Sequence, residues 1–162
     1  MRYLILIFFL ISCSYEKYES SEQPPVAGEC VNGTATHNIN GEDYNFECND
    51  YDLVGHVSLE QMDAESGNDC WGWTDPMTGK EYALMGLDNG TGIIDITDPY
   101  NPNYLGKIPT ATLSSTWRDI KVFKDHAFIV SEAAGHGLQI FDLSKLRNII
   151  EVQEFQPDLV YE

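Results

Sequence analysis

The chain has 162 residues, enough for one domain with a hydrophobic core, and its 43% hydrophobic and 22% charged residues are typical of a globular protein. Acidic residues outnumber basic ones 26 to 9, and the formal charge of −17 repels phosphate backbones and anionic lipid headgroups. This balance excludes nucleic acid as an expected partner. A divalent cation stays open as a ligand, beside the simpler interpretation of an acidic, well-solvated surface.

Residues 1–12 have the pattern of an export signal. Arg2 supplies a short positive region, and the apolar run that follows is too short to cross a bilayer as a stable helix. The run ends in Leu10-Ile11-Ser12-Cys13, which resembles a bacterial lipobox. We therefore expect residues 1–12 to be a lipoprotein signal peptide and Cys13 to carry the lipid. The alternative is an ordinary secretory signal cleaved near Ser12; in both cases the protein leaves the cytoplasm.

Residues 13–27 are polar and almost free of aliphatic side chains. Such a stretch cannot bury enough apolar surface to fold, so it is predicted to be a flexible tether between the lipid and the domain. Ser14, directly after the lipidated cysteine, resembles an outer-membrane address. The expected location is the outer membrane or the cell surface, with the membrane as a partner through the lipid, or secretion if the lipobox is not used.

Three cysteines remain after Cys13. Cys30 and Cys48 flank a segment whose Asn-Gly pairs are typical of turns, and in an oxidising compartment a disulfide between them is expected. Cys70 lies in an aromatic stretch and is expected to be a buried apolar thiol rather than a reactive one. No Cys-x-x-Cys pair occurs, so a thiolate zinc site is not supported.

From Tyr51 onward, short β-like runs alternate with turn sequences. Asp75 to Lys80 has the composition of a hairpin turn, and Asp88-Asn89-Gly90 that of a second tight turn. No stretch of a dozen residues has helical periodicity; 144–150 could form one helical turn. The expected strands are 54–59, 71–73, 82–87, 93–96, 104–108, 120–123, 127–130, 139–141 and 152–155.

These runs repeat along the chain. Asp95-Ile96-Thr97 recurs 47 positions later as Asp142-Leu143-Ser144. The preceding strand, 83–86, matches 128–131 at a spacing of 45 positions, which implies two residues inserted in the Gly135-His136 turn. A period in the forties with about four short strands per unit is the signature of a β-propeller blade. Further pairs at the spacing of 47 are Gly90 and Gly137, Asn101 and Asn148, Leu105 and Val152, and Ile108 and Phe155.

The repeat predicts an all-β fold with about two four-stranded blades, whereas a closed propeller needs roughly four to eight. Each blade has two apolar faces, and radial packing of several blades buries both. We therefore expect residues 28–162 to be the N-terminal part of a propeller domain that a longer chain completes. The alternative is that another chain completes the ring.

Several longer strings then resemble one family. They are Asn68 to Pro76, Asp95 to Gly106, Trp117 to Val122, His126 to Gly137 and Phe141-Asp142-Leu143. In this order they look like the bacterial choice-of-anchor B proteins, whose cores carry LVIVD-type β-propeller repeats, and the resemblance covers Cys30 to about Tyr161. It implies a propeller at the cell surface held there by an anchor, and it implies no established biochemical activity.

Residues that could carry chemistry are few. The best cluster for a divalent cation is Asp119, His126, Glu132 and His136; the alternative is that these side chains serve only turns and strand ends. No nucleophile motif occurs, and Asp95 and its repeat equivalent are expected to be structural because each unit carries one. No catalytic residue and no cofactor is expected, and the chain is not expected to be an enzyme.

The expected function is a binding, adhesion or scaffold module, with a surface glycan or a protein as ligand. Contact is expected through the loops at 88–92 and 133–137, because propellers present their connections at one rim. Trp71, Trp73 and Trp117 could offer a carbohydrate platform, although large rings between blades more often serve packing. The alternative function is a metal-dependent surface hydrolase whose catalytic groups lie mostly in further C-terminal blades.

Overall fold

The computed structural model describes residues 28–39 and 41–162. The predicted signal peptide, Cys13 and the tether at 13–27 lie outside these residues. Within them the fold is all-β, as the sequence predicts, and the strands form three sheets. This part of the chain has no helix with the length and hydropathy of a membrane span.

The first sheet is a small antiparallel unit made of β1 (Cys30–Val31), β2 (Thr34–Ile39) and β3 (Glu42–Glu47). Asn32 and Gly33 make the first turn with φ values of 51° and 83°, the left-handed conformation that an Asn-Gly hairpin turn requires. A disulfide joins Cys30 and Cys48, whose Cα atoms are 5.9 Å apart. The bond closes a sheet that is too small to be stable by packing alone.

Residues 48–66, the linking segment, connect this sheet to the next and contain no strand, so the predicted strand at 54–59 is wrong. Ser58 and Gln61 instead cap a turn: the amide of each donates to the side-chain oxygen of the other, at 2.8 and 3.1 Å. Val57 and Met62 pack on one face of the next sheet. The apolar residues that suggested a strand therefore cover a sheet and do not join its ladder.

The second sheet has the strand order β11-β7-β6-β5-β4. Its strands are β4 (Gly67–Thr74), β5 (Glu81–Leu87), β6 (Gly90–Asp95), β7 (Asn103–Pro109) and β11 (Gln153–Glu154). The first four are consecutive antiparallel neighbours, and the predicted turns at 75–80 and 88–90 connect β4 to β5 and β5 to β6. β4 is left at the edge of the sheet.

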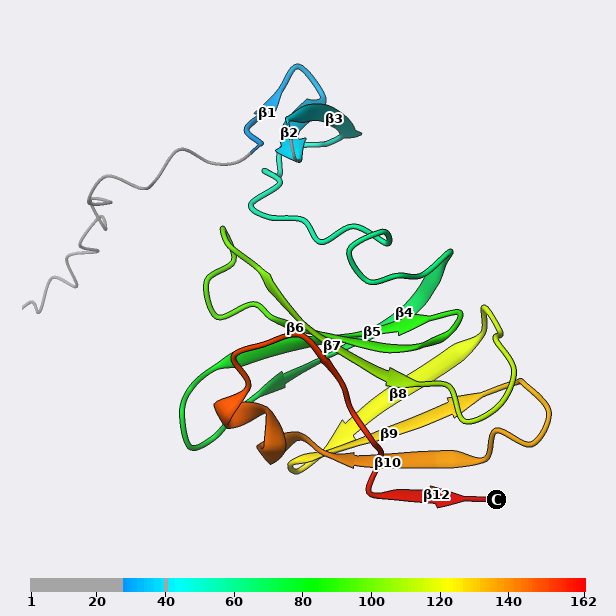
Figure 1. Cartoon of the computed structure of the whole chain (residues 1–162). Helices are drawn as coiled ribbons and strands as arrows, with labels where there is room; N and C mark the ends of the chain where they lie inside the picture. The colour runs from blue at the N-terminus through cyan, green and yellow to red at the C-terminus, as the bar shows by residue number, and fades with distance from the viewer. Residues whose placement is uncertain (1–27, 40) are drawn as a thin grey trace, which may run out of the picture.

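The third sheet has the order β12-β10-β9-β8 and lies against the second (Figure 1). Its strands are β8 (Arg118–Phe123), β9 (His126–Ser131), β10 (Leu138–Asp142) and β12 (Leu159–Tyr161). The predicted helical turn is the 3-10 helix η1 (Leu143–Asn148). Asp142 is its N-cap and accepts a hydrogen bond from the Ser144 amide at 2.9 Å. Asp95 accepts the same bond from Thr97, so this aspartate is structural in both units.

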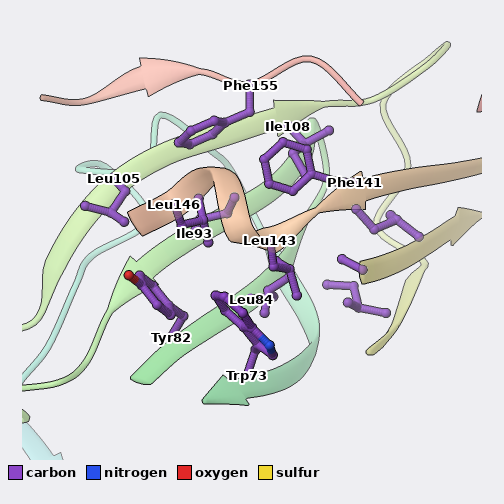
Figure 2. Close-up of a cluster of buried hydrophobic side chains, with 13 residues drawn as sticks. Trp73, Tyr82, Leu84, Ile93, Leu105, Ile108, Phe141, Leu143, Leu146 and Phe155 are labelled. Carbon is purple, nitrogen blue, oxygen red and sulfur yellow. The ribbon is translucent and has the colours of Figure 1, made fainter. Parts of the chain in front are cut away.

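The main hydrophobic core lies between these two large sheets (Figure 2). On one side of the core the rings of Trp73 and Tyr82 stack, with their centres 5.3 Å apart. On the other side the rings of Phe141 and Phe155 meet edge-on, with their centres 5.6 Å apart. Leu143 and Leu146 of η1 close the end of the core. The further buried members are Leu84, Ile93, Leu105, Ile108, Ile120, Ala127 and Ile129.

The strand pairing corrects the register of the repeat. Ile94 lies opposite Ala83, and Phe141, 47 positions after Ile94, lies opposite Ala127. Ala83 therefore corresponds to Ala127 at a spacing of 44, not 45, and the later turn carries three extra residues. Both faces of these strands are apolar. The hydrophobic pattern alone therefore could not show that the predicted alignment of the two repeats was displaced by one residue.

With the corrected register, equivalent faces of the two large sheets point the same way. Ala83 and Ile94 face the linking segment, whereas their equivalents Ala127 and Phe141 face the second sheet. The two sheets are therefore stacked head to tail and not face to equivalent face. Such heterologous packing can continue with further sheets of the same kind.

The last strand of the second unit departs from the repeat, and the predicted equivalence of Leu105 and Val152 is wrong. β11 pairs in parallel with β7 of the preceding sheet, with Gln153 opposite Gly106. Leu105 is therefore 3% exposed and Val152 64%. β12 pairs with β10, in the position that β11 would hold if it followed the repeat.

Candidate functional site

A shallow groove, here called the Trp117 groove, opens where the edge of β4 meets the first strands of the third sheet. Its volume is about 360 Å³. Trp117, which is 62% exposed, is the one aromatic side chain among its lining residues. The other lining residues are Asn68, Asp69, Arg118, Asp119, Val130, Ser131 and Glu132.

Hydrogen bonds fix the backbone on both sides of Trp117 while its ring stays free. The Trp117 carbonyl accepts from the Ser131 hydroxyl at 3.0 Å and from the Glu132 amide at 3.3 Å. Ser115 accepts from the Trp117 amide at 3.3 Å and donates to the Glu132 carboxylate at 3.2 Å. The backbone at Trp117 is therefore fixed, and the exposed indole extends from the residue just before β8.

Carboxylates make the floor of the groove acidic. Lys121 Nζ lies 2.6 Å from Asp119 and 3.6 Å from Asp69, and its hydrogen bond lowers the pKa of Asp119 below the usual range. Asp69 also accepts a hydrogen bond from the Ile120 amide at 2.8 Å, which ties β4 to β8. One ammonium thus serves two carboxylates, and Glu132 adds a third, so the groove carries net negative charge.

The four predicted cation ligands do not come together. Asp119 and Glu132 both line the groove, but His126 begins β9 at the opposite end of the hairpin, opposite Phe123. His136 is buried, with Nε2 2.9 Å from Arg118 Nη1. Residues 28–39 and 41–162 contain no group of three His, Cys, Asp or Glu side chains placed to hold a metal ion.

Arg118 joins the two loops that the sequence assigned to one rim. Its guanidinium is buried; Nε donates to the Leu87 carbonyl at 3.0 Å, next to the 88–92 loop, and Nη1 reaches His136 in the 133–137 loop. Burial lowers the pKa of Arg118. The two loops therefore lie at the same end of the two large sheets, although Gly90 to Gly92 belong to β6.

The three tryptophans have different environments. Trp73 is buried in the core and stacks on Tyr82, as packing requires. Trp71 is half covered, with Lys121 Nζ 4.6 Å from its ring centre. Trp117 alone of the three is mostly exposed, so it is the one suited to a ligand.

Cys70 is an exposed free thiol, and the prediction that it is buried is wrong. It lies on the edge strand β4, on the face opposite the main core, and that face is covered only in part by the linking segment. Cys70 lines a second cavity of about 360 Å³, here called the Cys70 cavity, together with His56. Burial lowers the pKa of His56, which favours the neutral imidazole.

An ion pair that the sequence did not indicate joins the two units. Asp75, in the β4–β5 turn, is fully buried and accepts hydrogen bonds from Arg147 of η1 at 2.8 and 2.9 Å. These bonds, with others from Thr78 and the Met77 amide, hold the pKa of Asp75 far below its usual range. The partners are 72 positions apart, and no local pattern could pair them.

We expect Asp75→Asn to flatten the acid dependence of stability. Because the folded pKa is lowered, the contribution of Asp75 is complete above its unfolded pKa of about 3.9 and is lost as the pH falls toward the folded value. The parent protein should therefore lose stability progressively below about pH 4, and the variant less steeply over the same range. Thermal unfolding from pH 7 to pH 2.5 measures this, with Asp98→Asn, an exposed turn residue, as the control. An equal loss of thermal stability with falling pH in the parent and in Asp75→Asn would refute the role of the ion pair.

No family model, curated protein or solved structure matches the chain. The features that bear on its function are the groove, the repeat and the N-terminal sequence.

Proposed function

We propose that this chain is an exported, lipid-anchored surface module of propeller-type repeats that binds a carbohydrate in the Trp117 groove. The observation that carries the proposal is an exposed indole, on a backbone fixed by hydrogen bonds, beside three carboxylates and an asparagine. An indole offers a flat apolar surface to the C–H face of a sugar ring. Carboxylate oxygens accept hydrogen bonds from sugar hydroxyls, which fixes orientation.

The propeller interpretation rests on two features of the large sheets. They stack head to tail, and their first strands, β4 and β8, lie next to each other. Asn68 donates to the Arg118 carbonyl at 3.0 Å, and Asp69 accepts from the Ile120 amide. Blades packed radially place their first strands around the central axis. The Trp117 groove would then open toward that axis, and the resemblance to choice-of-anchor B proteins supports this arrangement.

The proposed address rests on the lipobox at Cys13 and on the polar stretch at 13–27. The disulfide between Cys30 and Cys48 supports it, because such bonds persist in oxidising compartments outside the cytoplasm. A lipid on Cys13 would hold the protein at the outer membrane or cell surface. The tether would then leave the groove accessible to glycans around the cell.

We expect Trp117→Ala to weaken glycan binding by about 30-fold, the loss expected when a central aromatic anchor worth about 2 kcal/mol is removed. The 162-residue chain is applied to an array of bacterial and host glycans, and the best ligand is titrated by isothermal titration calorimetry, which does not depend on the Trp117 fluorophore. Phe123→Ala is the matched control, because Phe123 is 66% exposed at the far end of the same hairpin. Equal affinity of the two variants would refute the groove as the site. Binding to no glycan on the array would refute the ligand class.

A further inference from the structure

The Cys70 cavity lies between the linking segment and the outer face of the second sheet, away from the Trp117 groove. Four of its lining residues carry soft or imidazole donors: His56, Met62, Cys70 and Met85. The rest of the lining is glycine and apolar side chains, with no carboxylate among the described residues that form it. Cys70 is exposed, so a small ion can reach the cavity from solvent.

Two of the three sulfur-bearing residues lie on adjacent strands, and the third, Met62, comes from the linking segment and lies over the next strand. Cys70 on β4 lies directly opposite Met85 on β5, and Met85 lies opposite Gly92 on β6. A β-carbon built on Gly92 would be 3.2 Å from Met62 Sδ, so the Met62 sulfur occupies the space over that glycine. Neighbouring strands are about 4.8 Å apart, and three rotatable bonds let each methionine bring its thioether toward the thiol.

His56 supplies a nitrogen that the fold leaves unused. Its Nδ1 is buried and has no hydrogen-bond partner in the described part of the chain. The ring is held 5.4 Å from the Phe46 ring, centre to centre, which fixes it beside the cavity. A buried polar atom without a partner costs free energy, and a metal ion bound to its lone pair would remove that cost.

This donor set selects among metal ions. Thiolate and thioether sulfur bind Cu(I) in preference to the hard cations, which need several oxygen ligands, and imidazole also suits copper. We propose that the Cys70 cavity binds one Cu(I) ion through Cys70, Met62 and Met85, with His56 as a fourth ligand. Binding converts the Cys70 thiol to the thiolate and releases one proton to solvent, while the copper stays in the +1 state.

The test is an anaerobic titration of the Cu(I)–bicinchoninate complex with the 162-residue chain, with ascorbate as the reductant because it leaves the disulfide intact. All proteins carry Cys13→Ser, so that Cys70 is the one remaining thiol of the four cysteines. We expect one equivalent of Cu(I) to be withdrawn from the chelator. Cys70→Ser and Met85→Leu should each weaken binding at least tenfold, about the loss expected when a supporting group at a metal site is removed.

Met77→Leu is the matched control, because Met77 is 77% exposed on the β4–β5 turn, outside the cavity, and should bind as the parent does. Cys70→Ser and Met85→Leu nearly conserve volume, and unchanged circular dichroism shows that their losses are not unfolding. X-ray absorption of the parent should show sulfur neighbours of copper. Failure to withdraw Cu(I), or equal affinity of the Cys70→Ser and Met77→Leu proteins, would overturn the proposal.

Discussion

Phe141→Ala is expected to lower the free energy of unfolding by about 3–5 kcal/mol, as truncation of a fully buried aromatic ring does. Phe141 is 1% exposed and packs between the two large sheets, against Phe155. Phe155 directly follows β11, which pairs with β7 of the second sheet. The Phe141 ring therefore holds the two units together through the core between the sheets and through its contact with Phe155. The cavity left by alanine cannot close without moving both sheets.

Urea unfolding followed by tryptophan fluorescence measures this loss. Phe123→Ala is the matched control, because that ring is exposed and its removal should change the free energy by no more than about 0.5 kcal/mol. The change in Phe141→Ala should be a shift of the midpoint with little change of slope. A Phe141→Ala protein as stable as Phe123→Ala would mean that the two sheets do not share this core.

Gly106→Ala is expected to detach β11 from β7. Gly106 has a φ of 129°, and a β-carbon there would lie 1.7 Å from the Gln153 carbonyl oxygen, on the strand that crosses over. Neither backbone can move away without breaking its own ladder. The substitution combines an unfavourable backbone conformation, about 1–2 kcal/mol, with overpacking of about 1–3 kcal/mol.

Gly79→Ala is the matched control for a positive φ. Gly79 also has a positive φ, of 73°, but a β-carbon there would meet nothing within 4 Å. The excess loss in Gly106→Ala over Gly79→Ala therefore contains the clash with β11 and the additional backbone strain at a φ of 129°. Hydrogen exchange shows where the structure is disturbed. The Phe155 amide donates to the Lys107 carbonyl, and in Gly106→Ala it should lose its protection from exchange. Equal losses and a protected Phe155 amide would contradict the crossover.

Much of the β-structure could be predicted from local sequence. The strands from β4 to β10 and the turns between them follow from alternating apolar residues and Asp/Asn/Gly punctuation, which are local signals. The linking segment was assigned wrongly because apolar residues that cover a sheet resemble those within one. The crossing of β11 was missed because its cause, the close approach of Gln153 to Gly106, depends on a contact between distant parts of the chain.

The candidate site was predictable only in part. Trp117, Asp119 and Glu132 stood out as residue types, but their grouping with Asp69 depends on β4 and β8 lying side by side. Their separation from His126 depends on which end of the hairpin each occupies. The exposure of Cys70 follows from the edge position of β4, which strand pairing decides and composition does not.

The most direct test of the proposed role as a lipid-anchored surface module is to label, with radioactive palmitate, bacteria that express the 162-residue chain. We predict label on the parent protein and none on Cys13→Ser, with the labelled protein in the outer-membrane fraction. Label on neither protein, together with a cytoplasmic chain whose Cys30 and Cys48 are reduced, would contradict the export, the anchor and the surface function built on them.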